Sequence, residues 1–195
     1  MFMENPPFPR GTTFGSGATV AATDGPQYEG KEYLFPDVNP NNPGSFRSNA
    51  VVRCRVVRNN SGVAINAKKI CKLDKGGAAN EDNYSKVSGL TATAADKGYP
   101  ADEYLSSAGA AANDLFYVVV NGPATVTSDS AGATNFAVGQ VVVPGATTTG
   151  SVVTQDTTQV GANLFNQINN AIGKALQAVN AVSTDLLVDV GGHIK

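Results

Sequence analysis

The sequence predicts a mainly β protein: a β-sandwich or barrel-like domain of about eight short strands, with a long extended N-terminal arm and one short helix near residues 160–170. Three observations predict this fold class. Short apolar or alternating segments recur between turns rich in Gly, Pro, Asn and Ser, as in all-β domains. Charged residues make up only 15% of the 195 residues, below the usual quarter. The apolar residues are mostly small, which favours thin, closely packed layers.

Residues 1–45 are predicted to form the extended arm, and residues 46–195 a single β-rich domain. The arm holds seven of the ten prolines. Because proline fixes φ and lacks a backbone N–H, this spacing forbids a helix or an interior strand. Aromatic residues are nevertheless frequent in the arm, whereas disordered tails are usually poor in them. We therefore expect anchors that contact this subunit or a neighbouring one; the alternative is a disordered terminus. The expected anchors are Phe2, Phe8, Phe14, Tyr33, Leu34 and Phe35.

The first predicted strand pair covers residues 50–58 and 62–73, joined by an NNSG turn at 59–62. Val and Cys alternate with Arg in the first segment, which indicates a half-buried strand. In the second segment the apolar positions change parity, which indicates a bulge near Lys68 and Lys69.

Two cysteines fall in this predicted hairpin. If Arg58 pairs with Val63, Cys54 lies opposite Ala67, and Cys71 is four residues further along the return strand. At roughly 3.4 Å per strand residue, that separation is beyond disulfide reach. We expect two free thiols and a protein made in a reducing cytoplasm.

Residues 74–113 are polar, rich in Gly and Ala, and weakly patterned. We expect a loop-rich insertion with one short strand near residues 84–90. For residues 101–113 a short helix is an equal alternative.

The segment LFYVVV (115–120) is continuously apolar, which favours burial on both faces of a sheet. Asn121 and Gly122 follow it, and this dipeptide is typical of a tight hairpin turn. We therefore expect the return strand at residues 124–129.

The last third of the chain predicts strands at residues 136–145, 150–154 and 185–192. Apolar residues spaced by four predict the helix at 160–170. Gly173 interrupts that pattern, and residues 171–179 could instead begin a strand. The expected inward face of the terminal strand consists of Leu186, Val188 and Val190.

Charge is unevenly distributed along the chain, whose net charge is −2. Eight of the fourteen basic residues and one acidic residue lie between Arg47 and Lys75, which leaves +7 there and −9 elsewhere. We expect a solvated hairpin edge or a contact with an acidic protein surface. Nucleic-acid binding is disfavoured because no stacking aromatic residues are interleaved with these charges. The candidate contact residues are Arg47, Arg53, Arg55, Arg58, Lys68 and Lys69.

Residues suited to catalysis or metal binding are few. His193 is the only histidine, and with two cysteines it does not match a zinc-site spacing. The acidic pairs Glu81–Asp82, Asp102–Glu103 and Asp185/Asp189 leave a two-carboxylate hydrolase open. The loop at 37–45 is rich in oxygen ligands but lacks the calcium-binding order, and its prolines favour a turn. We expect no enzyme activity, cofactor or metal, and neither a membrane span nor a secretory signal.

Four motifs, taken in order, resemble one family. The segment RCRVVRNNSGVAINAKKI (53–70) is similar to a strand-turn-strand motif of capsid cement, or head decoration, proteins of tailed bacteriophages. The carboxyl half of those proteins carries similar segments in the same order. These are DLFYVVVNGPATV (114–126), VGQVVVPG (138–145) and IGKALQAV with LLVDVGG (172–192). The chain departs from the pattern at Gln140, often acidic in the family, and in the long insertion at 154–170.

The resemblance implies a small β-rich protein, commonly trimeric and without catalytic activity, on the outer capsid surface. The leading hypothesis is a structural virion protein that binds the major capsid protein and stabilises the shell by bridging neighbouring subunits. It would act as a homotrimer, without direct contact with nucleic acid or membrane. The alternative is a receptor- or glycan-binding module of a phage fibre. The absence of Trp weighs against that alternative.

Overall fold

The protein is described here from a computed structural model of the chain. The residues that the structure describes are 5–15, 27–42, 44–75, 82–129, 135–146, 148–156, 158, 160–179 and 184–191.

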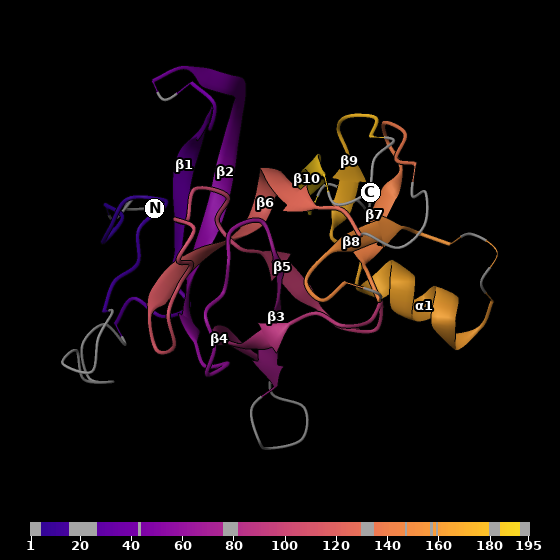
Figure 1. Cartoon of the computed structure of the whole chain (residues 1–195), viewed down its shortest axis with the longest axis horizontal. Coiled ribbons are helices and arrows are strands. Elements are labelled where there is room, and N and C mark those ends of the chain that lie inside the picture. Colours follow the sequence, from indigo (N-terminus) through magenta and orange to yellow (C-terminus); the bar gives the residue numbers. More distant parts are fainter. Residues whose placement is uncertain are drawn as a thin grey trace.

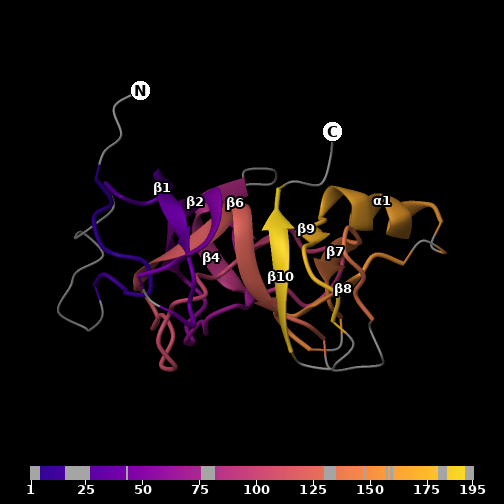
Figure 2. The ribbon, with the colours of Figure 1, turned by 90° about the horizontal axis from the view of Figure 1, so that it is seen from above.

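Within these residues one sheet of ten strands and one short helix make up the regular structure (Figures 1 and 2). The strands are β1 Glu32–Val38, β2 Phe46–Asn59, β3 Ile70–Lys75, β4 Asp82–Leu90, β5 Gly98–Pro100, β6 Leu115–Thr127, β7 Val141–Pro144, β8 Val152–Thr154, β9 Gly173–Ala175 and β10 Asp185–Val190. The helix, α1, covers Ala162–Asn169. The predicted mainly β fold class is confirmed, although the sheet does not close into a barrel.

The strand order is β5-β3-β4-β2-β6-β10-β9-β7-β8, and β1 pairs with β2. β6 lies between the strands of the N-terminal part and those of the C-terminal part (Figure 1). Its first half pairs with β2 and its second half, from Gly122, pairs with β10. One long strand therefore holds the two parts of the sheet together.

The predicted tight turn at Asn121 and Gly122 is wrong. β6 continues through both residues, and residues 124–127 extend it instead of returning beside it. Opposite Arg53 and Cys54 of β2 stand Asn121 and Val119, so Val120 is an extra residue in the β6 strand. Gly122 has a φ of 97°, and a Cβ atom there would lie 2.7 Å from the Val51 carbonyl oxygen. The dipeptide therefore forms a bulge that turns β6 from one partner to the other.

The predicted hairpin between residues 50–58 and 62–73 is also wrong. β2 pairs with β1 and β6, and it meets β4 only at Arg58 and Asn59. The Asn59 side chain donates hydrogen bonds to the carbonyl oxygens of Val63, Ala110 and Ala111. These bonds hold the chain after β2 as a loop instead of a return strand. Apart from an isolated bridge between Ile65 and Ala110, strand pairing resumes at β3, which lies between β4 and β5.

Other predicted elements are confirmed. The strand near residues 84–90 is β4, and the segments at 150–154 and 185–192 contain β8 and β10. The predicted helix near 160–170 is α1. The alternative of a strand within residues 171–179 is also confirmed, because β9 lies there. In the segment at 136–145 only Val141–Pro144 forms a strand. Residues 101–113 form turns and bridges, without a helix.

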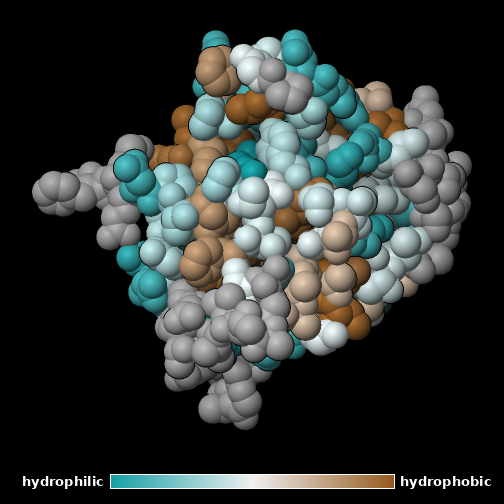
Figure 3. Space-filling model, turned by 60° about the vertical axis from the view of Figure 1, so that its left-hand side comes forward, coloured by the Kyte–Doolittle hydropathy of each residue, from teal (hydrophilic) through white to brown (hydrophobic). Residues whose placement is uncertain are grey.

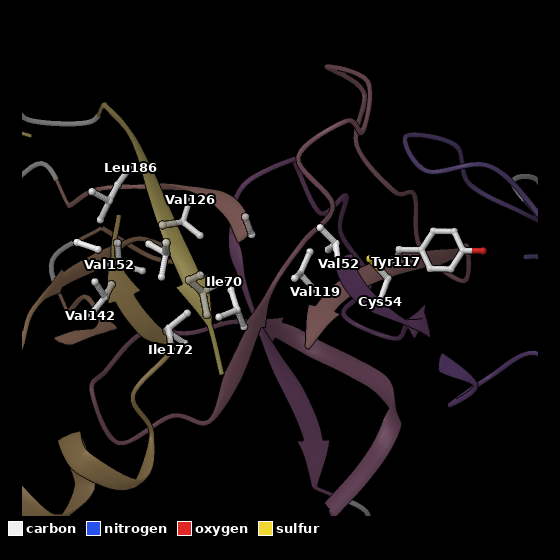
Figure 4. Close-up of a cluster of buried hydrophobic side chains, with 14 of the residues drawn as sticks. Val52, Cys54, Ile70, Tyr117, Val119, Val126, Val142, Val152, Ile172 and Leu186 are labelled. Carbon is white, nitrogen blue, oxygen red and sulfur yellow. The ribbon is translucent and has the colours of Figure 1, made fainter. Parts of the chain in front are cut away.

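Buried side chains form two clusters on opposite faces of β6. Leu115, Tyr117 and Val119 belong to the first cluster. Phe116, Val118 and Val120 belong to the second, so burial of this segment on both faces is confirmed. The first cluster runs from Cys54 and Tyr117 to the C-terminal strands (Figure 4). Its C-terminal members include Val142, Val152, Ile172 and the inward face Leu186, Val188 and Val190.

The hairpin of β1 and β2 projects beyond the rest of the sheet (Figure 1). β1 lies within the predicted arm, and among the described strands it pairs with β2 alone. An edge position is where a strand tolerates a proline such as Pro36. The residues of β2 before Val52 are exposed or half-buried, whereas nearly all that follow are buried. The hairpin is therefore packed into the core from Val52 onward, and its part before Val52 is exposed.

Candidate interaction surface

A buried ion cluster connects the hairpin to the body of the sheet. Arg47 of β2 donates hydrogen bonds to Asp37 of β1 and to Glu103, at 2.6 and 3.0 Å from Nη2, and to Thr125 of β6 at 3.0 Å from Nη1. The side chains of Asp37 and Glu103 are fully buried, and that of Arg47 is 16% exposed. Four segments of the chain thus meet at one guanidinium group.

The electrostatics of this cluster favour its charged form. Burial disfavours the charge of Arg47, but the hydrogen bonds to Asp37 and Glu103 outweigh that cost and raise its pKa above the ordinary value. Ser48 donates a further hydrogen bond to Asp37 at 2.7 Å, and Thr125 donates one to Glu103. Because both buried carboxylates accept hydrogen bonds from Arg47 and from a neighbouring hydroxyl, the cluster acts as a rigid cross-link.

A second ion pair holds the N-terminal segment on the same loop. Arg10 donates from Nε and Nη2 to Asp102 Oδ1, at 3.0 and 2.8 Å, and the Gly11 N–H donates to Oδ2 at 2.7 Å. Burial raises the pKa of Asp102, and the Arg10 guanidinium opposes that shift. The Arg10 guanidinium also lies over the Tyr104 ring, 4.5 Å from its centroid.

An apolar pocket of about 370 Å³ lies beside this ion pair. It is lined by Arg10, Gly11, Thr12, Phe35, Pro36, Val38 and Tyr104. The Tyr104 hydroxyl donates a hydrogen bond to the Val38 carbonyl oxygen, and burial raises the pKa of that phenol to about 12. Two main-chain hydrogen bonds, those of Gly11 and Val38, therefore hold the pocket walls in place.

Two further hollows separate the hairpin from the C-terminal strands. One, of about 460 Å³, is lined by residues that include Val51 of β2, Leu176 and Leu187. The other, of about 400 Å³, has a mostly polar lining. Its residues are Asn39, Pro40, Asn41, Arg47, Lys68, Glu103, Thr125, Gln177, Asp185 and Leu187. Because Arg47 and Leu187 line both hollows, the two adjoin each other along the base of the hairpin.

The structure separates the predicted arm anchors into two groups. Phe8 and Tyr33 are buried in the core of the same chain, and Phe35 is partly buried against it. The Phe8 ring packs against the Tyr117 ring at a tilt of 36°, with ring centroids 4.6 Å apart. Phe14 and Leu34 are 37% and 43% exposed. This second group is the more accessible to a partner, although Phe35 also lines the apolar pocket, and Phe2 lies outside the described residues.

The predicted basic residues do not form an open cationic patch. Five of the six are paired with acidic residues of the same chain. Arg47 pairs with Asp37 and Glu103, Arg53 and Arg55 with Glu32, Arg58 with Glu29, and Lys68 with Asp185. Lys69 is half-buried next to β3. A contact of these residues with an acidic partner would therefore compete with existing ion pairs.

The structure bears on three kinds of site that the sequence left open: a reactive cysteine, a two-carboxylate hydrolase and a metal site. Both cysteines are free and buried, as predicted, and burial raises the pKa of Cys54 to about 12. Asp185 and Asp189 lie four residues apart along one strand, roughly 13 Å, whereas glycosidase carboxylates stand about 5–9.5 Å apart. Among the described residues no cluster of three metal-ligating side chains occurs. The side chains of Glu81 and Asp82, and all of His193, lie outside the described part.

No helix in the described part of the chain has the length and apolar character needed to cross a membrane.

Sequence reasoning named Asp102 and Glu103 only as a possible carboxylate pair, and it did not predict that they and Asp37 bind Arg10 and Arg47. Asp37 and Glu103 are separated by 66 residues, and Arg10 and Asp102 by 92. No local spacing signals such pairs. A weak signal existed in Arg47, which stands alone at the start of a long β segment.

The chain matches no protein-family model and no curated protein. Among solved structures it is similar to the crystal structure of the head fiber gp8.5 N base in bacteriophage phi29, with 15% sequence identity. The match covers 73% of this chain and 96% of that chain, and its TM-score is 0.41. A TM-score of this size establishes neither a common fold nor a common function.

Proposed function

We propose that this chain is a structural protein of a bacteriophage particle that binds the outer surface of the capsid and bridges neighbouring major capsid subunits. The observation that carries the proposal is the projecting β1–β2 hairpin, which is held rigidly by buried ion pairs and bears exposed apolar side chains. Those side chains are Leu34, Phe46 and Val51, which are 43%, 67% and 54% exposed. The order of the segments that resemble motifs of capsid cement proteins supports the same interpretation, although residues 53–70 do not form the strand-turn-strand of that resemblance.

Rigidity is what makes such a hairpin suitable for bridging. Because the Arg47 cluster fixes its orientation, little conformational entropy is lost when the hairpin binds. The exposed apolar side chains of the hairpin then contribute binding free energy when they are buried against the partner. On a symmetric shell, many copies of a modest contact act together through avidity. A homotrimer, which the resemblance implies, would multiply the contact further.

The ion pairs also support a role without catalysis. The carboxylates Asp37, Asp102 and Glu103 are engaged by arginines, and burial keeps the thiol of Cys54 protonated. The same pairing leaves little free positive charge for phosphate contacts, which supports a protein partner over nucleic acid. We therefore propose the major capsid protein as the partner, and no cofactor.

The test is an add-back assay on capsids of the phage that encodes the chain, purified from a deletion strain. We expect the purified protein to bind these capsids and to raise the temperature at which they release DNA. The variant Leu34→Ser with Val51→Ser should bind more weakly. Val138→Ser, at a residue that is 68% exposed in the turn before β7, is the matched control. Absence of binding by the unaltered protein would contradict the proposal.

The polar hollow below the hairpin favours a second candidate, a receptor- or glycan-binding module of a fibre. Its Asn, Gln, Asp and Lys side chains offer both hydrogen-bond donors and acceptors to a polar ligand. The same purified protein should then bind host cells or host surface glycans, and Gln177→Ala should weaken that binding. Binding to host cells together with no binding to capsids would favour this candidate over the first.

A further inference from the structure

An unpaired carboxylate lines the hollow between the hairpin and the C-terminal strands. This hollow, of about 460 Å³, has aliphatic walls that include Val51, Pro123, Leu176 and Leu187. Asp189 also lines it, and it lies on the same face of β10 as Leu187. Within the described part of the chain, the half-buried Asp189 carboxylate has no hydrogen-bond or ion-pair partner. The hollow therefore combines apolar walls with one uncompensated negative charge.

The neighbouring basic residues do not neutralise Asp189. Lys174 of β9 stands opposite Asp189 in the strand register, but it is exposed, does not line the hollow, and forms no ion pair with Asp189 in the described structure. Arg47 does line the hollow. The three nitrogens of its guanidinium group, however, all donate hydrogen bonds to Asp37 or Glu103. With two carboxylates and one guanidinium group, the lining carries a net charge of −1.

The bulge of β6 forms one side of this hollow. Asn121, Gly122 and Pro123 line it at the point where β6 changes its partner from β2 to β10. Gly122 approaches the Val51 carbonyl oxygen so closely that a Cβ atom would lie 2.7 Å from it. Pro123 stands opposite Asp189 in the register of β6 and β10. Because paired strands build this side, an occupant would not have to order it on binding.

We propose that the hollow is the binding site for a basic side chain, lysine or arginine, of the partner protein. The methylene stem would pack on the aliphatic walls, and the charged group would bind Asp189, because such side chains combine an apolar stem with a cationic end. Charge decides against the other occupants. An apolar side chain would desolvate the Asp189 carboxylate without compensation. An acidic side chain would be repelled by Asp189, while the nitrogens of Arg47 are already engaged.

The site deepens the proposed function and rests on it, because the partner there is the major capsid protein. Val51 belongs both to the exposed apolar surface of the hairpin and to the wall of the hollow. Figure 3 shows brown, apolar surface among teal at the top of the molecule, the end at which Figure 1 places the tip of the hairpin. The hollow would add one ion pair to this apolar contact. The sign of that ion pair is opposite to the sign expected from the basic segment of the sequence.

The first experiment tests the hollow without a capsid. The full chain is titrated with n-butylammonium, and the methyl signals of Leu176 and Leu187 are followed by NMR. We expect these signals to shift with butylammonium but not with butyrate, which has a similar stem and the opposite charge. Asp189→Asn should weaken binding by about tenfold, as for a close charge pair, whereas Asp189→Glu should retain it. Absence of shifts, equal shifts with both probes, or undiminished binding by Asp189→Asn would overturn the proposal.

The second experiment tests the occupant in the capsid add-back assay. Asp189→Asn should bind about tenfold more weakly than the unaltered protein, and the difference should shrink as the salt concentration rises. The matched control is Asp185→Asn, which removes the same charge from the same strand, at a side chain that is 59% exposed and paired with Lys68 at 2.6 Å. This control should bind like the unaltered protein.

The two experiments separate the site from the proposed function. Equal capsid binding by Asp189→Asn and the unaltered protein, or an equal loss for Asp189→Asn and Asp185→Asn, would overturn the site and leave the proposed function intact. If the unaltered protein does not bind capsids, the proposed function fails. Binding of butylammonium that requires Asp189 would then still support a site for a basic side chain, on a partner other than the capsid.

Discussion

At the scale of single residues, Arg47 has an influence that its position near the exposed end of β2 does not suggest. Its side chain is mostly buried, and it donates hydrogen bonds to two fully buried carboxylates, those of Asp37 and Glu103. Removal of one partner from a buried ion pair is costly because the remaining charges stay desolvated. The stability of the hairpin therefore depends on this side chain as well as on the strand pairing of β1 and β2.

We predict that Arg47→Met lowers the free energy of unfolding by about 3–5 kcal/mol. Arg47→Lys should lie between this variant and the unaltered protein, because an ammonium group cannot reproduce the fork of hydrogen bonds. The control is Arg53→Met, whose side chain is 49% exposed beside Glu32 and should cost about 0–1 kcal/mol. Urea unfolding of the three variants measures the difference. Equal losses for Arg47→Met and Arg53→Met would refute the role of the cluster.

Cys54 provides a second test at this scale. Burial raises the pKa of its thiol to about 12, and burial also raises the pKa of Cys71. Since the thiolate is the reactive form, both cysteines should react negligibly with a disulfide reagent at pH 8 in the folded protein. Both should react within seconds to minutes in urea. Rapid reaction of the folded protein would show that the core opens locally.

At the scale of elements, several predictions from the sequence were correct because they depended on local pattern. The period of two in DLLVDV and the four-residue spacing before Gly173 identified β10 and α1. The tight turn at Asn121 and Gly122 was wrong for an instructive reason. The positive φ that permits a hairpin turn also permits a bulge, and the choice depends on which strands lie beside β6. Those partners, β2 and β10, are distant in the sequence.

Gly122 allows a prediction about this bulge. Gly122→Ala places a Cβ atom 2.7 Å from the Val51 carbonyl oxygen, on a residue with a φ of 97°. Gly139→Ala is the matched control, because Gly139 has a φ of 86° but open space around its Cβ position. The control should cost about 1–2 kcal/mol for its backbone conformation alone. Gly122→Ala should cost roughly 1–3 kcal/mol more, because of overpacking. Thermal unfolding measures both, and equal costs would contradict the close approach.

At the scale of the whole molecule, the candidate interaction surface could be predicted only in part. The proline-rich start of the chain indicated an extended segment with aromatic anchors, and aromatic residues there do contact the core. Which of these aromatic residues are buried could not be predicted, because Phe8 is positioned by its contact with Tyr117. The neighbouring Arg10 is positioned by Asp102. Such contacts arise from the tertiary fold and have no counterpart in local spacing. The basic segment was similarly neutralised by acids from other elements.

The shared strand β6 leads to a prediction about folding of the whole chain. Its first half pairs with β2, its second half pairs with β10, and the first hydrophobic cluster spans both parts. If either part unfolded alone, β6 would lose one partner and the cluster would be split. We therefore expect one cooperative transition in urea, as is usual for a single core. Native-state hydrogen exchange should give the amides of Val56 in β2 and Val188 in β10 the same free energy of opening as denaturant rises. Opening of β10 several kcal/mol below β2, with a separate early transition in circular dichroism, would show that the C-terminal strands form an independent unit.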